Sequence, residues 1–213
     1  MRSFTRTANR AGGSRREEIT AQLLDAVEAL LGEGHAYSEL SVERLATVAG
    51  LSRSSFYRYF ADKGELLLAL ADDVVNGLNE TGRRVWSLPP GSSREDLQDA
   101  IGALLAEGRE HRMVFGAIVD AQSYDPAIRE HYAAIVGEAI SYVSSHIETG
   151  QREGWVRDGI EPEATAEWLC TMTERGMSAV VGAAPGNRIP ALAHSLAEII
   201  WRTLYDGVRD RTP

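Results

Sequence analysis

The sequence contains few of the residues that build disulfide, metal or membrane-spanning structures. One cysteine, Cys170, cannot form an intramolecular disulfide or a cysteine-based metal cluster. The histidines lie far apart, and Glu107 with His111 forms only a weak metal-ligand pair. The densest aliphatic run, residues 66–71, is far shorter than the roughly 20 residues that cross a bilayer. We therefore expect no disulfide, no metal ion or other cofactor, and no membrane span.

Signals for secretion and for catalysis are also lacking. No apolar run of about 7–15 residues follows the basic N-terminal segment, so we expect a reduced, cytoplasmic protein. No Gly-rich phosphate loop, nucleophile elbow or paired-carboxylate pattern is present, so we expect that the protein is not an enzyme. The 44% hydrophobic and 25% charged residues match an ordinary globular protein and exclude disorder of the whole chain.

Charge is distributed unevenly along the 213 residues. The net charge is −9, yet residues 1–64 carry nine basic against eight acidic side chains. Residues 1–16 contain five arginines and no acid, and Lys63 is the one lysine in the chain. A basic end on an acidic body is compatible with local binding to nucleic acid, although the total charge argues against indiscriminate binding.

Apolar residues recur at helical spacing almost throughout, and no segment alternates as a strand does. We therefore predict an all-α protein with a flexible basic arm over residues 1–14, an N-terminal three-helix domain over 15–62 and a C-terminal helical bundle over 63–213. The expected helices number about nine, and they begin near residues 15, 41, 52, 63, 93, 111, 126, 162 and 190.

Residues 41–63 have the spacing of a helix-turn-helix. Ser41 and Ser52 are suitable N-cap residues for two short helices, and Gly50 lies between them in the position that favours a left-handed turn. Phe56 and Phe60, four residues apart, would face Leu45, Val48 and Leu51 in the small core. The remaining faces of the second helix are then free to enter a major groove of DNA.

The second of these helices carries side chains that suit base and phosphate contacts. Arg53 lies in its first turn and can donate two hydrogen bonds to guanine, a contact worth about 1–3 kcal/mol of base discrimination. Ser55 and Tyr57 can reach a base or a phosphate, whereas Tyr59 and Lys63 are better placed for backbone contacts that set register.

This segment resembles the DNA-binding motif of the TetR family of bacterial transcriptional repressors. The shared pattern is Ser41-Val42, the turn Ala46–Ser52, the helix Arg53–Phe60 and Lys63. Ser54, Ser55 and Tyr59 depart from the residues common in the family, which affects the operator sequence rather than the fold. By this resemblance the DNA-contacting positions are Ser41, Ser52, Arg53, Ser55, Tyr57, Tyr59 and Lys63.

The C-terminal part resembles the branch of this family that contains the mycobacterial ethionamide-resistance repressor, through residues 172–175 and 200–205. The resemblance implies a homodimer formed by the last two helices, and an apolar pocket for a small hydrophobic ligand. The candidate ligand-binding residues are Phe115, Val119, Tyr142, Cys170, Thr173 and Trp201. Aromatic residues at helical spacing, which here include Trp168, are also typical of a core, and Cys170 also fits an inert buried thiol.

The function that we predict from the sequence is a ligand-responsive repressor. It would bind a pseudo-palindromic double-stranded DNA operator as a dimer and be released by a small apolar effector. Two alternatives stay open: an activator of the same fold, and an all-α enzyme or carrier with a vestigial helix-turn-helix.

Overall fold

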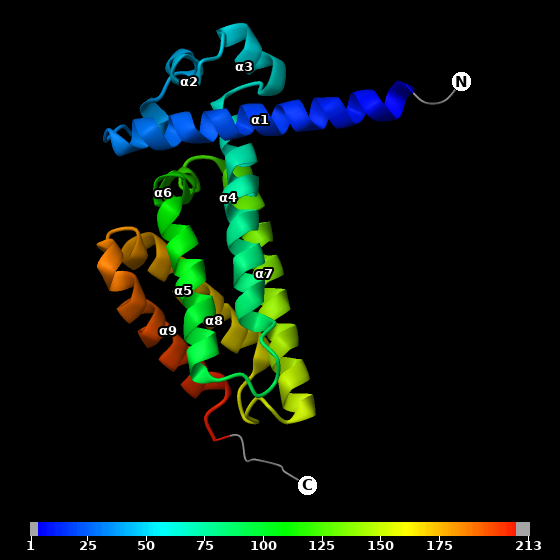
Figure 1. Cartoon of the computed structure of the whole chain (residues 1–213), viewed down its shortest axis with the longest axis vertical. Helices are drawn as coiled ribbons and strands as arrows, with labels where there is room; N and C mark the ends of the chain where they lie inside the picture. The colour runs from blue at the N-terminus through cyan, green and yellow to red at the C-terminus, as the bar shows by residue number, and fades with distance from the viewer. Residues whose placement is uncertain (1–3, 208–213) are drawn as a thin grey trace. The chain divides into compact units, whose positions relative to one another are not determined.

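The computed structural model describes the backbone of residues 4–207 and the side chains of residues 15–207. Every regular element within that range is helical, which confirms the predicted all-α class (Figure 1). The α-helices are α1 (Phe4–Gly32), α2 (Val42–Val48), α3 (Arg53–Tyr59), α4 (Lys63–Trp86), α5 (Arg94–Glu110), α6 (Arg112–Ala121), α7 (Pro126–Glu153), α8 (Pro162–Gly176) and α9 (Ile189–Leu204).

The chain divides into two compact units, and α4 contributes to both. The first unit contains the chain up to Val74 together with Met113–Arg129, and the second contains Val75–Arg112 with the chain from Glu130 onward. The predicted boundary between residues 62 and 63 divides the chain by expected function, whereas the two units are defined by packing. The boundary therefore stays a prediction.

Helix α1 is longer than the sequence pattern indicates, because it begins at Phe4 rather than near Arg15. The backbone of residues 4–14 is therefore helical where we expected an irregular arm, while residues 1–3 and the side chains of residues 1–14 lie outside the described part. The flexibility of that arm stays a prediction. From Ile19 onward the apolar stripe of α1 is buried in the first unit, including Leu23, Val27 and Leu30.

The core of the first unit contains both phenylalanines of the predicted motif. Phe56 and Phe60 are fully buried, as is Leu45 of α2. Val48 was expected to join them, but 47% of its surface is exposed. The buried face of α2 is centred on Leu45 and Ala46, and the helical rotation places Val48 beyond its edge.

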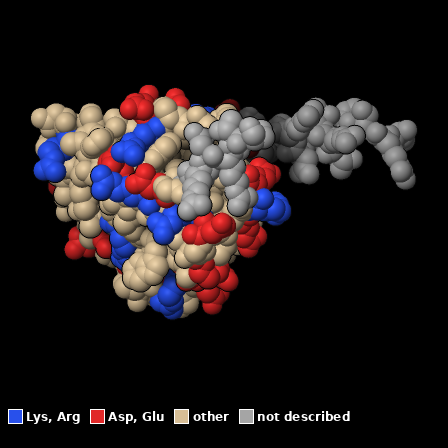
Figure 2. All heavy atoms as spheres, turned by 90° about the horizontal axis from the view of Figure 1, so that it is seen from below, with Lys and Arg blue, Asp and Glu red and all other residues tan. Residues whose placement is uncertain are grey.

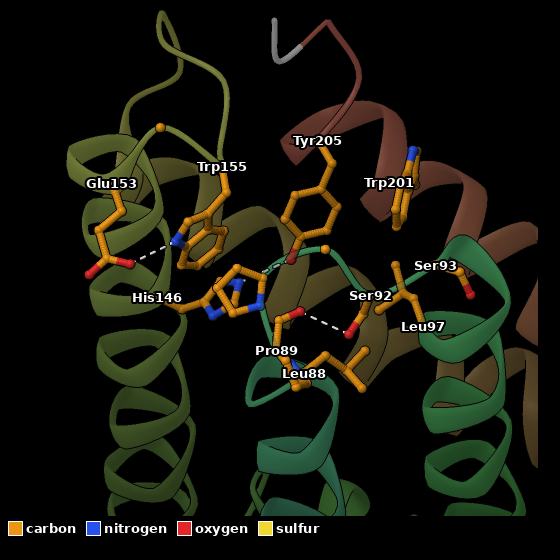
Figure 3. A pocket seen from close by; sticks show the side chains of 13 residues that line it. Leu88, Pro89, Ser92, Ser93, Leu97, His146, Glu153, Trp155, Trp201 and Tyr205 are labelled. Atoms are coloured by element: carbon orange, nitrogen blue, oxygen red, sulfur yellow. Dashed lines mark hydrogen bonds between the residues drawn. The ribbon is translucent and has the colours of Figure 1, made fainter. Parts of the chain in front are cut away.

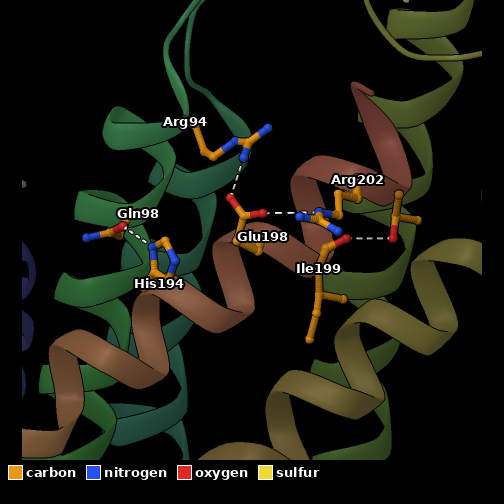
Figure 4. Close-up of polar contacts among 7 residues, drawn as sticks. Arg94, Gln98, His194, Glu198, Ile199 and Arg202 are labelled. Carbon is orange, nitrogen blue, oxygen red and sulfur yellow. Dashed lines mark hydrogen bonds and ion pairs between the residues drawn. The ribbon is translucent and has the colours of Figure 1, made fainter. Parts of the chain in front are cut away.

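In the second unit α5 and α9 run side by side (Figure 1). A Cβ at Gly102 of α5 would meet Cβ of Ala193 at 3.9 Å, so small residues on both helices allow close packing. Polar contacts fix the register of the pair. Arg94 of α5 forms an ion pair with Glu198 of α9 at 2.5 Å, and His194 Nδ1 lies 2.9 Å from Oε1 of Gln98 (Figure 4).

The helix that begins at Pro162 continues into a π-helical segment, Met177–Val181, which the sequence did not indicate. Its first residue fills the space beside Gly108 of α5, since a Cβ on Gly108 would lie 2.8 Å from the sulfur of Met177. The capping box at the start of α5 is confirmed, with Ser93 and Asp96 bonding each other's backbone. Val208, expected to extend the last helix, lies outside the described residues.

The surface carries charges of both signs. On the face that Figure 2 shows, acidic and basic side chains lie next to one another rather than in separate regions. Within residues 4–207 we find no helix of the length and apolarity that a membrane span needs.

Replacing Gly50 by alanine should lower the free energy of unfolding by about 1–2 kcal/mol. The φ of Gly50 is +69°, which an L-residue adopts only at a cost, although a Cβ there would meet no atom within 4 Å. Urea unfolding followed by circular dichroism measures the effect. Gly32→Ala is the matched control, because a Cβ at Gly32 also meets open space and φ there is not positive. An equal loss in both variants would contradict the assignment of strain to φ at residue 50.

Candidate functional site

A short turn of defined geometry joins α2 to α3. The N–H of Leu51 donates to the carbonyl of Ala46 at 2.8 Å, and the N–H of Gly50 donates to that of Thr47 at 3.1 Å. With Gly50 in the left-handed region, these two bonds form a Schellman motif that ends α2 and satisfies its last carbonyls. The direction in which α3 leaves the turn is thereby set by the backbone.

Both predicted N-cap serines make the expected contacts. Ser41 Oγ accepts from the N–H of Arg44 at 3.1 Å, and Ser52 Oγ accepts from the N–H of Ser55 at 3.0 Å. The hydroxyl of Ser55 also lies 2.8 Å from Ser52 Oγ. These three hydroxyls thus stabilise the ends of α2 and α3, and any contact with DNA would be additional to that role.

Arg53 and Tyr57 form the exposed face of α3. The guanidinium carbon of Arg53 lies 5.6 Å from the centre of the Tyr57 ring, a cation–π distance. The Tyr57 ring also meets the buried ring of Phe56 edge-on, with centres 5.6 Å apart. Tyr57 is 45% exposed. The pair is therefore positioned by the contact of Tyr57 with Phe56 of the core and is accessible to solvent on its other side. Tyr59 is half-buried, and its hydroxyl interacts with Arg15 of α1.

Lys63 has an internal role that the sequence did not indicate. Its ammonium group donates to three backbone carbonyls at 2.5–3.4 Å, those of Tyr37, Ser38 and Leu40. An ammonium group has three N–H donors, so these bonds use its full capacity. Lys63 can therefore attract a phosphate through its charge, but a direct hydrogen bond would require it to leave a carbonyl.

Tyr37 is the residue in this region that sequence reasoning missed. It lies in a 3₁₀ turn, Tyr37–Glu39, and is buried. Its hydroxyl donates to the carbonyl of Lys63 at 2.6 Å, and burial raises the pKa of this hydroxyl well above its ordinary value. Tyr37 and Lys63 thus bond each other's backbone and connect the start of α4 to the turn that precedes α2.

A cavity of about 450 Å³ lies in the second unit (Figure 3). It is bounded by the loop after α4, the first turns of α5 and the ends of α7 and α9. Four aromatic or imidazole rings line it, together with one carboxylate, prolines, leucines and small residues. The lining residues are Leu88, Pro89, Pro90, Gly91, Ser92, Ser93, Leu97, His146, Glu153, Gly154, Trp155, Trp201 and Tyr205.

Of the six predicted ligand-binding residues, Trp201 lines this cavity and five do not: Phe115, Val119, Tyr142, Cys170 and Thr173. Phe115 is buried and Val119 half-buried, both on α6 in the first unit, whereas Tyr142 is exposed. Burial raises the pKa of the Cys170 thiol to about 11, which leaves it protonated and unreactive at neutral pH. Thr173 donates its hydroxyl to the carbonyl of Leu169 at 2.8 Å. Their ligand contacts stay predictions.

Sequence reasoning missed His146, Trp155 and Tyr205, which line the cavity with Trp201. No spacing rule joins residues that come from the C-terminal part of α7, from the loop after it and from the end of α9. Trp168 is neither core nor cavity lining, since 76% of its surface is exposed. Among residues 15–207, no three His, Cys, Asp or Glu side chains are grouped as a metal site requires.

Two family descriptions match the chain in sequence. Residues 23–70 match "Bacterial regulatory proteins, tetR family", and residues 97–206 match "Transcriptional regulator EthR, C-terminal domain". The first match contains the helix-turn-helix, and the second extends from Leu97 in α5 to the end of α9 and contains seven of the thirteen residues that line the cavity.

The chain is also similar in sequence to individual regulators. The chain is 27% identical to the HTH-type transcriptional regulator EthR of Mycolicibacterium smegmatis over 207 residues, 95% of this chain and 94% of that protein. It is 29% identical to EthR of Mycobacterium tuberculosis over 175 residues, 82% and 79% of the two chains.

Solved structures share the fold. One is the complex of SmeT, a repressor from Stenotrophomonas maltophilia, with triclosan, at a TM-score of 0.72 and 19% identity over 90% of this chain and 94% of that one. Another is the fatty acid degradation regulator FadR of Bacillus halodurans, at a TM-score of 0.70 and 13% identity over 90% and 96%. With both halves of the sequence matched, the chain belongs to the TetR family of bacterial regulators and is a helix-turn-helix transcriptional regulator.

Proposed function

We propose that this regulator is a dimeric repressor that binds a pseudo-palindromic operator and leaves it when a small, largely apolar effector binds. The observation that carries the proposal is the exposed pair Arg53 and Tyr57 on α3, held in place by the turn at Gly50. Two copies of α3 related by a two-fold axis would enter successive major grooves about 34–36 Å apart.

The contacts of α3 suggest which side chains read bases. The guanidinium of Arg53 is exposed and stacked, so it can turn toward guanine O6 and N7 with little loss of side-chain entropy. Tyr57 can offer its hydroxyl to a phosphate and its ring to a thymine methyl group. Ser41, Ser52, Ser55 and Lys63 would contribute mainly to register and affinity, because their hydrogen bonds hold them close to the backbone. Tyr59 would do the same, because its hydroxyl interacts with Arg15 of α1.

Replacing Arg53 should change sequence preference more than total affinity. Selection of binding sites from random duplexes should yield a palindrome for the wild-type protein, with one guanine in each half-site that depends on Arg53. Arg53→Ala removes the guanidinium and with it both hydrogen bonds to guanine, so discrimination at that base pair should fall by about 1–3 kcal/mol. A palindrome recovered unchanged with Arg53→Ala would show that another residue reads it.

Replacing Lys63 should weaken binding to all sequences alike. Lys63→Ala should reduce the slope of log affinity against log salt by about one, because one phosphate-neutralising charge is lost. It should also lower the free energy of unfolding, since three carbonyls lose their donor. Lys63→Arg retains the charge and serves as the control in both measurements. A salt slope unchanged in Lys63→Ala would remove this residue from the DNA interface.

Exposed apolar residues on the last two helices support a dimer interface. Trp168 on α8 is 76% exposed and Ile199 on α9 is 46% exposed. Large apolar side chains such as Trp and Ile are unfavourable when they are exposed to water, and aromatic residues are typical of the centres of protein interfaces. Thr171 and Arg175 continue the exposed face of α8, and Arg202 continues that of α9.

Introducing charge on this face should convert the dimer to monomer. Sedimentation velocity should give a dimer for the wild-type protein and a monomer for the double variant Trp168→Asp, Ile199→Asp, with loss of operator binding. Tyr124→Asp is the matched control, because Tyr124 is 56% exposed but lies in the first unit on neither helix. If the double variant remained dimeric, the interface would lie elsewhere.

Release by an effector requires that ligand and DNA favour different conformers. Helix α4 contributes to both compact units, so a shift of its C-terminal half would be transmitted along one continuous helix. A ligand moves this equilibrium only by the difference between its affinities for the two conformers. The triclosan complex of SmeT is consistent with an apolar effector for this fold.

A further inference from the structure

We propose that the cavity of the second unit binds an organic cation, a compound with a quaternary ammonium head group and apolar substituents. We call His146, Trp155, Trp201 and Tyr205 the aromatic box, with Glu153 at its rim. Only the expected effect of the cation on DNA binding rests on the proposed function. Binding of the cation itself depends on this cavity alone.

The rings of the aromatic box form a continuous wall. The ring centres of His146 and Trp155 lie 4.8 Å apart, and those of Trp155 and Tyr205 lie 6.5 Å apart. Trp201 continues the wall, 5.2 Å from Tyr205 (Figure 3). Aromatic faces carry partial negative charge and attract cations, most strongly when the face is tryptophan and the site excludes water.

A tight turn holds Trp155 in this wall. The carbonyl of Gly150 accepts from the N–H groups of Gly154, Trp155 and Val156 at 2.8–3.0 Å. A Cβ on Gly150 would lie 2.6 Å from the Trp155 ring and 2.3 Å from Val156, so only glycine allows this approach. Trp155 is therefore positioned by the backbone before any ligand arrives.

The imidazole in the wall favours a cation because it is neutral. Burial lowers the pKa of His146 below its ordinary value, and its Nε2 lies 3.0 Å from the hydroxyl of Tyr205. Burial raises the pKa of Tyr205 to about 12, so its hydroxyl keeps its proton and shares a hydrogen bond with Nε2. Trp86 and Trp155 supply the other rings packed on His146.

The charges at the cavity have the sign that a cation needs. Glu153 is the one ionised side chain among the lining residues, and its Oε2 accepts from Trp155 Nε1 at 2.9 Å. Arg94 lies 5.4 Å from the centre of the Trp201 ring and pairs with Glu198, which Arg202 also contacts. Residues 75–112 and 130–207 contain seventeen acidic against ten basic side chains. This balance attracts cations and repels anions.

The size of the cavity leaves room for more than a head group. A volume of about 450 Å³ is within the range of sites for drug-sized ligands. Leu88, Leu97 and the two prolines that follow Leu88 provide the remaining apolar wall. A trimethylammonium group against the rings, with an apolar substituent along these residues, would use both kinds of surface.

The test compares two soluble probes that differ in charge alone. Choline and 3,3-dimethylbutan-1-ol have the same shape, with nitrogen in one replaced by carbon in the other. Isothermal titration of the full-length protein without DNA, at 0.15 M salt, should show choline binding about tenfold more tightly. Equal affinities, tighter binding of the alcohol or no binding of choline would overturn the inference.

Variants locate the site. Trp155→Ala and Trp201→Ala should each abolish the preference for choline, whereas Tyr124→Ala, which removes an exposed aromatic ring of the first unit, should retain it. Glu153→Gln should weaken choline by about threefold and leave the alcohol unchanged, since an exposed carboxylate contributes modestly. Glu148→Gln, also exposed on α7 but not lining the cavity, is its control. Retention of the preference in both tryptophan variants would place the cation elsewhere.

The outcome at DNA separates this inference from the proposed function. Should a tryptophan variant fail to fold, the comparison of the two probes on wild-type protein and on Glu153→Gln still decides the inference. If choline binds selectively but leaves operator affinity unchanged, the cation site stands and the effector response fails. If choline does not bind more tightly than the alcohol, the inferred cation site is wrong. Operator binding and its release by a neutral compound are then decided by their own measurements.

Discussion

The orientation of α3 in the helix-turn-helix depends on the packing of one phenylalanine. Phe56 is fully buried beside Leu45, and because side chains of a helix have fixed angular positions, its burial turns the opposite face of α3 toward solvent. The Schellman bonds at Gly50 set the entry angle, and the cap of Ser52 sets the first turn. A seven-residue helix is too short to be stable alone, so its orientation and its existence come from the same contacts.

Local signals explain how much of this could be predicted from sequence. N-cap serines, the glycine between two short helices and the four-residue spacing of Phe56 and Phe60 act within a few residues, and the structure has each of them as predicted. Val48 was misjudged because the buried face of α2 is centred on Leu45 and Ala46, and the rotation of the helix takes Val48 beyond the edge of that face. The 3₁₀ turn at Tyr37 has no periodic pattern, and its partner Lys63 is distant in the chain.

The cavity of the second unit could not be predicted in the same way. Its rings come from the C-terminal part of α7, the turn after it and the last turn of α9, so their meeting depends on tertiary packing rather than on spacing. The resemblance to a known branch indicated Trp201, which does line the cavity, and five residues that do not. The close packing of α5 on α9, through Gly102 and Ala193, is what brings the end of α9 to this place.

The engagement of Lys63 also bears on chemical modification. The chain has one lysine, and its ammonium group is already occupied by three carbonyls, while every other cationic side chain apart from histidine is arginine. Acetylation acts on lysine and leaves guanidinium groups unchanged. The arginines of α3, Arg53 and Arg58, therefore keep their positive charge under the acetyl-transfer reactions that neutralise lysine in lysine-rich DNA-binding proteins.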